Sequence, residues 1–256
     1  MRALLLALLL WAGACHAQTA PSLQQRIGAP VPLQLAVRDD LGQPARLADF
    51  FRPGEPVLLV LGYYRCPELC GLVMHSLLQA AHDAGVPATQ WRIVGLSIDP
   101  QDTPLDARRR RTLALAYARF LQQANEDGVA PRLDLLVAAP PDVQHVAEAI
   151  GFTWRPREGS IEHPATVALL TPQGTVARYF NGIGIAPAEL RTALADAAQG
   201  RTGSWTDRLA LLCSHFAAST GRYTGTVMGV VRTLSLLTLA ALGAIAWRHM
   251  RKKDVA

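Results

Sequence analysis

Apolar residues in the central part of the chain occur either in short continuous runs or at helical spacing. Runs such as 57–64 have the length of buried strands, whereas 71–84 carries apolar residues at helical intervals and ends at Gly85. The pattern predicts strands at 57–64, 91–98, 133–138, 165–170 and 176–180. It predicts helices at 71–84, 105–124, 142–150 and 187–198. The sequence Thr171-Pro172-Gln173-Gly174 predicts a hairpin turn between the last two strands.

The order of these elements is β-α-β-α-β-α-β-β-α, and it determines the fold class that we expect. Strands that alternate with helices form a parallel sheet, and the final pair of strands adds an antiparallel hairpin to its edge. The sequence therefore predicts an α/β, thioredoxin-like domain, with a central mixed sheet covered by helices on both faces. This domain is expected to occupy residues 18–205.

The amino-terminal segment departs from this pattern. Met1 and Arg2 precede an apolar stretch from Ala3 to Ala12, and small residues follow up to Ala17. A charged start, an apolar centre and a small-residue end are typical of a secretory signal peptide. We therefore expect residues 1–17 to be a signal peptide. The tetrapeptide that ends at Cys15 also loosely resembles a lipobox, which leaves lipidation of Cys15 as an alternative.

The carboxyl-terminal segment predicts a membrane anchor. Residues 227–247 are mostly apolar and carry a single charge, Arg232 near their start, and a helix of this length crosses a bilayer core of about 30 Å. Four Arg or Lys residues follow in the tail 248–256, and the positive-inside rule places such a tail in the cytoplasm. The sequence thus predicts one transmembrane helix after a juxtamembrane segment, 206–226, with the folded domain on the outer side.

Net charge excludes one class of partner for the folded domain. The whole chain has a formal charge of +5, but residues 18–205 contain 17 Arg against 18 Asp plus Glu. Because the excess cations lie outside this domain, we expect no nucleic-acid binding. The single basic run, 108–111, lies in a predicted helix; we interpret it as a solvated face, with lipid headgroups or an acidic partner as the alternative.

Two cysteines occupy a position suited to metal or redox chemistry. Of the 4 cysteines, Cys15 lies in the signal, so too few remain for a disulfide framework. Cys66 and Cys70 follow a predicted strand and begin a predicted helix, whose amino-terminal N–H groups favour thiolates. Three residues separate them, so both sulfurs can face one soft cation such as Cu(I).

A third ligand would complete this site, and the histidines are its candidates. The chain has 7 histidines, at 16, 75, 82, 145, 163, 215 and 249. His163 differs from those in the ends and in helical patterns, because it stands in a loop just before the strand that enters the hairpin. An imidazole with two thiolates suits copper, Cu(I) especially, and Cu(II) if an oxygen ligand joins. The spacing alone leaves this choice open.

Three motifs together resemble the Sco/SenC family of copper-binding assembly proteins. They are Tyr64-Arg65-Cys66-Pro67-Glu68-Leu69-Cys70, then 94–100 with Asp102-Thr103-Pro104, then His163 ahead of a strand and a Pro-Gln-Gly turn. The resemblance covers roughly residues 25–198. It implies a membrane-tethered thioredoxin-like domain that binds copper through Cys66, Cys70 and His163. It also implies a role in building the dinuclear copper centre of cytochrome c oxidase.

The resemblance carries expectations about partners and location as well. It implies the apo cytochrome c oxidase copper-centre subunit, other copper chaperones or thiol reductants, and the membrane as partners, in the bacterial inner membrane with the domain facing the periplasm. The sequence departs from the family pattern at Gly71, where many members have proline, and at Pro164-Ala165-Thr166, where a serine is more usual. A carboxyl-terminal anchor is also the less common form and resembles a bacterial subgroup.

Alternative functions remain open at this point. A thiol-disulfide oxidoreductase would use Cys66 to attack and Cys70 to resolve, although a dedicated redox motif has a gap of two residues. A peroxidase of the peroxiredoxin type would share the fold and depend on Cys66. Near the membrane, Cys213 and His215 could form a copper relay or simply pack in an amphipathic helix. Met74 is expected in the core, with a soft axial ligand as the alternative.

Overall fold

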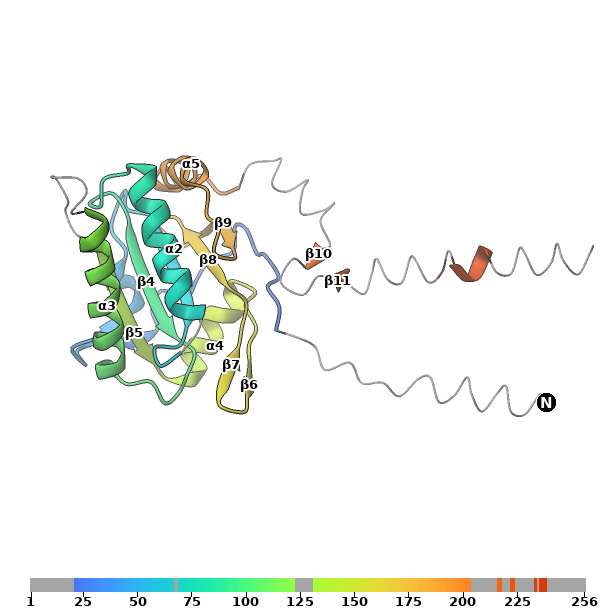
Figure 1. The fold of residues 1–256 in the computed structure, drawn as a ribbon, viewed down its shortest axis with the longest axis horizontal. Coiled ribbons are helices and arrows are strands. Elements are labelled where there is room, and N and C mark those ends of the chain that lie inside the picture. Colours follow the sequence, from blue (N-terminus) through green and yellow to red (C-terminus); the bar gives the residue numbers. More distant parts are fainter. Residues whose placement is uncertain are drawn as a thin grey trace, which may run out of the picture.

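A seven-stranded mixed sheet forms the centre of the computed structural model, which describes residues 21–66, 69–122 and 131–203 with short pieces at 216–217, 222–223, 233 and 235–238. The sheet has the order β2-β1-β5-β4-β3-β8-β9 (Figure 1). Its strands are β1 Ala36–Arg38, β2 Pro44–Arg46, β3 Val57–Gly62, β4 Arg92–Ser97, β5 Arg132–Ala138, β8 Thr166–Leu170 and β9 Val176–Asn181. The helices are η1 Leu47–Phe50, α2 Leu69–Ala84, α3 Pro104–Gln122, α4 Pro140–Ala149 and α5 Pro187–Ala198.

The central strands pair as the element order predicts. Strands β3, β4 and β5 are parallel neighbours, whereas β8 runs antiparallel to β3 and pairs with β9 in a hairpin. The turn of this hairpin is the predicted one, because Thr171 and Thr175 are bonded across it at 2.8 Å and Gly174 has a φ of +78°. The mixed thioredoxin-like sheet expected from the sequence is therefore confirmed.

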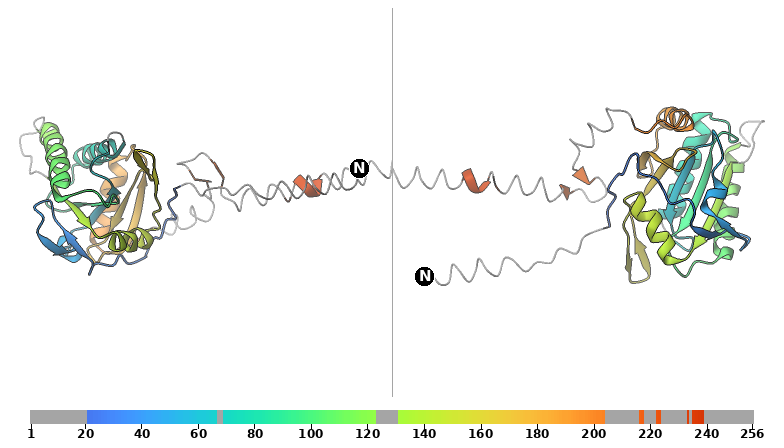
Figure 2. Two further views of the ribbon diagram at one scale, coloured as in Figure 1. Left: turned by 90° about the horizontal axis from the view of Figure 1, so that it is seen from below. Right: turned by 180° about the vertical axis from the view of Figure 1, so that it is seen from behind.

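Helices cover both faces of the sheet. Along β3 the side chains alternate, so that Leu58 joins the cluster beneath α2, α3 and α5 while Leu59 joins the cluster beneath α4 and η1. Figure 2, left, shows α4 and the blue amino-terminal strands on the side opposite α2 and α3. Burying each such side chain contributes about 1.5–3 kcal/mol. Met74 is 5% exposed within the first cluster, so its expected place in the core is confirmed.

Two features of the fold were not predicted from the pattern. Strands β1 and β2 are three residues each and mostly exposed, so they carry no apolar run to reveal them. A second hairpin, β6 Arg155–Arg157 with β7 Ser160–Glu162, lies where a loop was expected and projects from the body (Figure 1). Ion pairs from Arg155 and Arg157 to Glu162 link its strands, and Gly159 turns between them with a φ of +72°.

The predicted terminal segments lie mainly outside the described residues. The signal peptide at 1–17, the tail at 248–256 and most of the predicted membrane span at 227–247 belong to this undescribed part. Within the described part of the chain, no helix has the length and apolar character needed to cross a bilayer. The short strands β10 Phe216–Ala217 and β11 Arg222–Tyr223 form a small antiparallel pair within the segment 206–226, which was predicted to be juxtamembrane.

Candidate metal site

The cysteine motif lies at the carboxyl ends of the parallel strands. Strand β3 ends at Gly62, the chain turns through Tyr63, Tyr64 and Arg65, and Cys66 follows. Cys66 is half-buried and packs against the cluster beneath α4. Cys70 is the second residue of α2, which places it in the first turn of that helix as the sequence predicted, although its side chain lies outside the described part.

A buried carboxylate fixes the backbone just before Cys66. Asp102, in the loop between β4 and α3, accepts a hydrogen bond from the Tyr64 amide at 2.6 Å and from the Ser97 hydroxyl at 2.6 Å. Its other oxygen accepts from Nε of Arg65 at 3.0 Å, and Arg65 also pairs with Asp99 at 2.9 Å. The side chain of Asp102 is fully buried, so these donors replace the water that it loses. The second sequence motif thus holds the first in place.

The Tyr64 side chain anchors the same turn in the sheet. Its hydroxyl donates to the Leu136 carbonyl at 2.6 Å or to the Gly95 carbonyl at 3.1 Å, between β4 and β5. Burial raises the pKa of this phenol well above its ordinary value, and the charge of Asp102 adds to the effect. Tyr64 therefore stays protonated and acts as a fixed donor beneath the cysteine turn.

His163 lies at the same edge of the sheet, next to the cysteine turn. Its ring packs edge-on against Tyr63, with ring centroids 6.0 Å apart, and lies 5.9 Å from the ring of Phe152. The Cys66 amide in turn bonds the Tyr63 carbonyl at 3.4 Å. Tyr63 thus contacts both the cysteine turn and the histidine, so the loop that carries His163 lies close to this turn.

The imidazole of His163 is held in a form that suits metal binding. Its Nδ1 lies 3.0 Å from the Pro164 carbonyl, and because a carbonyl only accepts, Nδ1 carries the proton. The lone pair of the neutral ring then resides on Nε2, the atom that a metal would use. Burial lowers the pKa of His163, and the bond to Pro164 offsets part of this shift. The ring is therefore neutral at pH 7, so metal need not displace a proton from it.

Metal ligation itself remains a prediction for these three residues. Among the described side chains, which exclude that of Cys70, no three Cys, His, Asp or Glu groups are gathered as a metal site. What the described residues provide is a soft sulfur on Cys66, whose amide bonds the Tyr63 carbonyl, and a neutral imidazole on His163, whose ring packs against the Tyr63 ring. Two such ligands and a second thiolate from the first turn of α2 are the donor set that soft copper prefers.

The other candidate ligands lie elsewhere. His75 stacks on Tyr117 of α3, with ring centroids 4.2 Å apart; burial, and then the charge of Arg110, lower its pKa. His145 is exposed on α4. Cys15, Cys213 and His215 lie outside the described residues, so the proposed lipidation and relay roles remain predictions.

Arg110 is a residue at this edge whose role the sequence interpretation missed. From α3 it donates to the Tyr64 carbonyl at 3.1 Å and to the Cys66 carbonyl at 2.8 Å. Arg111 likewise bonds the Leu133 carbonyl at 2.7 Å, so the interpretation of 108–111 as a solvated face is wrong for both residues. One signal was available: four consecutive helical residues span about 300° around the axis, so they cannot all face solvent.

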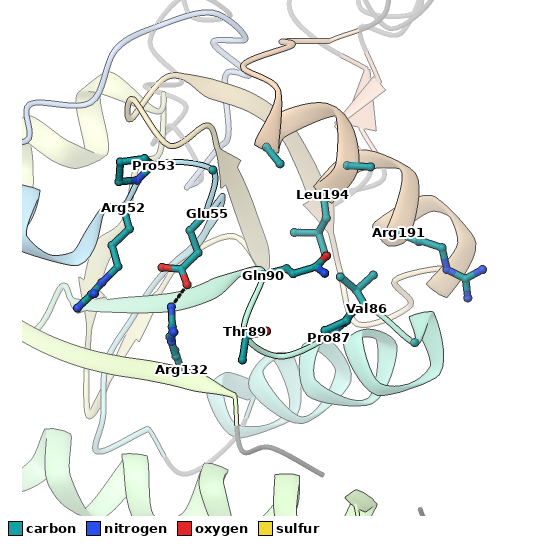
Figure 3. Close-up of a pocket in the computed structure, with 14 residues that line it drawn as sticks. Arg52, Pro53, Glu55, Val86, Pro87, Thr89, Gln90, Arg132, Arg191 and Leu194 are labelled. Atoms are coloured by element: carbon teal, nitrogen blue, oxygen red, sulfur yellow. Dashed lines mark hydrogen bonds and ion pairs between the residues drawn. The ribbon is translucent and has the colours of Figure 1, made fainter. Parts of the chain in front are cut away.

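A cavity of about 590 Å³ lies at the opposite ends of the parallel strands. It is bounded by the segment before β3, the loop before β4, the start of β5 and one side of α5. Figure 3 shows Leu194 of α5 on one wall and Glu55 facing Arg132 on the other. Because the cysteines follow the carboxyl end of β3, this cavity is separate from the candidate metal site.

Comparison with known proteins agrees with the motifs. The SCO1/SenC family model matches residues 34–199. The chain belongs to the SCO1/SenC family. The matched region contains the cysteine turn, the Asp102 loop and His163, together with the whole seven-stranded sheet.

Individual members of the SCO1/SenC family are distant in sequence. The mouse (Mus musculus) mitochondrial SCO2 homolog is 26% identical over 152 residues, which are 56% of this chain and 52% of that protein, so only about half of its length is matched. The copper-bound structure of Arabidopsis thaliana ScoI is 18% identical, with a TM-score of 0.52 over 68% of this chain and 99% of that one. BsSco, a Sco-family cytochrome c oxidase assembly protein with a disulfide switch, is 16% identical, with a TM-score of 0.50 over 69% and 98%. At these identities the solved structures show a shared fold.

Proposed function

We propose that this SCO1/SenC chain is a copper metallochaperone that assists assembly of the dinuclear copper centre of cytochrome c oxidase. Its cargo is a copper ion, Cu(I) or Cu(II), held by Cys66, Cys70 and His163. The observation that carries the proposal is the contact of Tyr63 with both Cys66 and His163, since it brings a soft sulfur and a neutral imidazole to one edge of the sheet. Copper-bound Arabidopsis ScoI, which shares the fold, supports copper as the cargo.

The positions of the ligands suit an ion that must later be released. Cys66 and His163 are only partly buried, so a partner's thiolate can approach from solvent. A three-coordinate soft ion can accept an incoming ligand before an old one departs, which lowers the barrier to transfer. The proposed recipient is the apo copper-centre subunit of the oxidase. Within the chain, Tyr63 orients the imidazole and Asp102 holds the cysteine turn.

Copper titration of the detergent-solubilised full chain tests this proposal. The reduced parent is expected to bind close to one copper ion, and Cys66→Ser, Cys70→Ser and His163→Ala are each expected to weaken binding and change the absorption of the copper–thiolate bond. His145→Ala is the matched control, because His145 is an exposed histidine on α4 and is not one of the proposed ligands. A parent that binds no copper, or an His163→Ala variant that binds like the parent, would overturn the ligand set.

A thiol-disulfide reductase is the second candidate, and the disulfide switch of BsSco favours keeping it. The Cys66 thiolate would attack a disulfide in the oxidase subunit, and Cys70 would displace the mixed disulfide. The subunit would leave with two thiols and this chain with a Cys66–Cys70 disulfide, which a separate thiol reductant must reduce. Loss of oxidase assembly in His163→Ala, with thiol exchange intact, would favour the copper role, because the reductase does not need the imidazole.

We also propose that residues 227–247 anchor the domain in the bacterial inner membrane, after removal of residues 1–17, with the domain facing the periplasm. The support is the apolar length of 227–247 and the cations that follow it. Deletion of 227–256 should move the protein from the membrane fraction to the periplasmic extract. Retention of the truncated protein in carbonate-washed membranes would contradict this anchor.

A further inference from the structure

Arg110 links helix α3 to the turn that carries Cys66. Its Nε donates to the Tyr64 carbonyl at 3.1 Å and its Nη2 to the Cys66 carbonyl at 2.8 Å. The two acceptors are two residues apart in the turn, so a planar guanidinium can hold both at once. A lysine ammonium in the same place would be a single point donor.

Gly71 leaves room for the third nitrogen of the same guanidinium. A Cβ added to Gly71 would lie 3.1 Å from Nη1 of Arg110, which is tighter than ordinary van der Waals contact. Gly71 follows Cys70 directly in the first part of α2. The guanidinium therefore bonds the Cys66 carbonyl at one end of the motif and occupies the space that a side chain at residue 71 would need at the other.

The part of helix α3 that carries Arg110 is firmly packed. Ala107 and Ala114, one turn before it and one turn after it on α3, are 0% and 2% exposed in the cluster that α3 shares with α2. The amino terminus of α3 is also fixed, because Thr103 and Asp106 bond each other's side chain and backbone in a capping box. Because the helix is fixed in this way, a side chain on it can hold a neighbouring loop in a fixed position.

The backbone N–H and the backbone carbonyl of Tyr64 are consequently both hydrogen-bonded. Its N–H donates to Asp102 at 2.6 Å and its carbonyl accepts from Arg110 at 3.1 Å. Asp102 lies in the loop just before α3 and Arg110 lies on α3, so one continuous segment, 102–110, supplies both contacts. The turn that leads to Cys66 is thus clamped against the start of α3.

We propose that Arg110 is a positioning residue that sets the placement of Cys66 relative to Cys70, and that the absence of a side chain at Gly71 permits its approach. This inference rests on the proposed copper role of the two cysteines. Arg110 does not touch the ion; it acts through the Cys66 carbonyl. The clamp holds the cysteine turn in its binding geometry before copper arrives, so affinity is gained because less order must be created on binding.

Four variants of the full chain in detergent test the clamp. Arg110→Gln removes the charge and the fork, Arg110→Lys keeps only the charge, and Gly71→Ala crowds the guanidinium. Arg109→Gln is the matched control, because Arg109 is the exposed neighbour on the same helix. Amide hydrogen exchange over residues 63–66 is measured on the reduced, copper-free protein, and copper affinity and the copper–thiolate absorption are measured on the loaded protein.

The clamp predicts faster exchange over 63–66 in Arg110→Gln, a copper affinity lower by about tenfold and a shifted copper–thiolate band. Arg110→Lys should recover part of each change, and Arg109→Gln should match the parent. Gly71→Ala separates the clamp most clearly from a purely local effect on helix α2. Alanine favours a helix over glycine, so a purely local effect would raise the melting temperature and leave the site alone. The clamp predicts weaker copper binding and a shifted band in Gly71→Ala, whatever the melting temperature does.

Unchanged exchange, affinity and absorption in Arg110→Gln and Gly71→Ala would overturn the inference. Should Arg110→Gln fail to fold, Arg110→Lys and Gly71→Ala carry the same test, and parent-like values in both would overturn it. A parent that binds no copper would refute the proposed function instead. In that case the exchange experiment on the copper-free chain still decides whether Arg110 holds the cysteine turn.

Discussion

The two ends of the parallel strands use arginine in different ways. At the far end, next to the cavity in Figure 3, Arg92 and Arg132 meet the buried carboxylate of Glu55. These ion pairs join the start of β3 to the starts of β4 and β5. At the cysteine end, Arg110 donates to two carbonyl oxygens of a loop. The far end therefore stabilises the sheet, whereas the near end positions a turn that the sheet alone does not fix.

Substitutions at each end of the strands test whether the two ends differ in this way. A far-end substitution should change the free energy of unfolding and leave the copper affinity of the folded protein intact. A near-end substitution that releases the backbone of the cysteine turn should change both quantities.

Glu55→Ala should produce the largest loss, about 3 kcal/mol in the free energy of unfolding, because it removes the carboxylate facing the buried Arg92 side chain. Urea unfolding followed by circular dichroism measures the loss. Copper affinity below the unfolding transition should equal that of the parent. A folded Glu55→Ala protein with weakened copper binding would show that the two ends are coupled.

Asp102→Ala should cost about 2 kcal/mol, because the Tyr64 amide and the Ser97 hydroxyl lose their buried acceptor. In contrast to Glu55→Ala, this change should also weaken copper binding, since the turn before Cys66 is released. The two variants are compared by urea unfolding and by copper competition with a chelator. Parent-like affinity in Asp102→Ala would remove the distinction between the two ends.

Tyr64→Phe should cost about 1 kcal/mol, because the hydroxyl no longer reaches the carbonyls of Leu136 and Gly95 while the ring stays in place. Thermal or urea unfolding measures this difference. The backbone contacts of residue 64 remain, so copper affinity should change little. A large loss of affinity would mean that the turn is held from the sheet rather than from α3.

Tyr63→Phe should have the smallest effect, below about 0.5 kcal/mol, because the hydrogen bond that its hydroxyl accepts from the Ile161 amide is long, at 3.5 Å. The ring that packs against His163 is retained, so copper binding should be unchanged. Tyr63→Ala, which removes that ring, should weaken binding, and copper titration of the two variants separates the effects. Equal binding by both would show that Tyr63 does not orient the histidine.

The sequence predicts the central fold well because its strands and helices carry strong apolar periodicity. Strand β3 and helix α5, for example, are each buried along a whole run or face. Strand β1 and the β6–β7 hairpin escaped prediction, since they are short and are held by pairing and ion pairs instead of an apolar run. An apolar pattern in the sequence indicates which residues are buried, and these short segments bury few side chains.

The candidate site likewise has one part that the sequence predicts and another that it does not. The neighbourhood of Cys66 and His163 follows from strand order, because the end of β3 and the start of β8 meet at one edge of the sheet. The role of Arg110 depends on where α3 packs against the cysteine turn. The spacing of residues within α3 does not indicate where that contact lies. The angular spread of four consecutive arginines shows that some must turn inward, but it does not show what they contact.

Copper K-edge absorption of the reduced, Cu(I)-loaded full chain tests the central claim most directly. The account predicts two sulfur ligands and one imidazole nitrogen in the parent, with the imidazole signal absent from His163→Ala and one sulfur lost in each of Cys66→Ser and Cys70→Ser. The exposed-histidine variant His145→Ala should give the parent spectrum. An imidazole signal that survives in His163→Ala, or a parent whose copper has no sulfur ligands, would contradict the account.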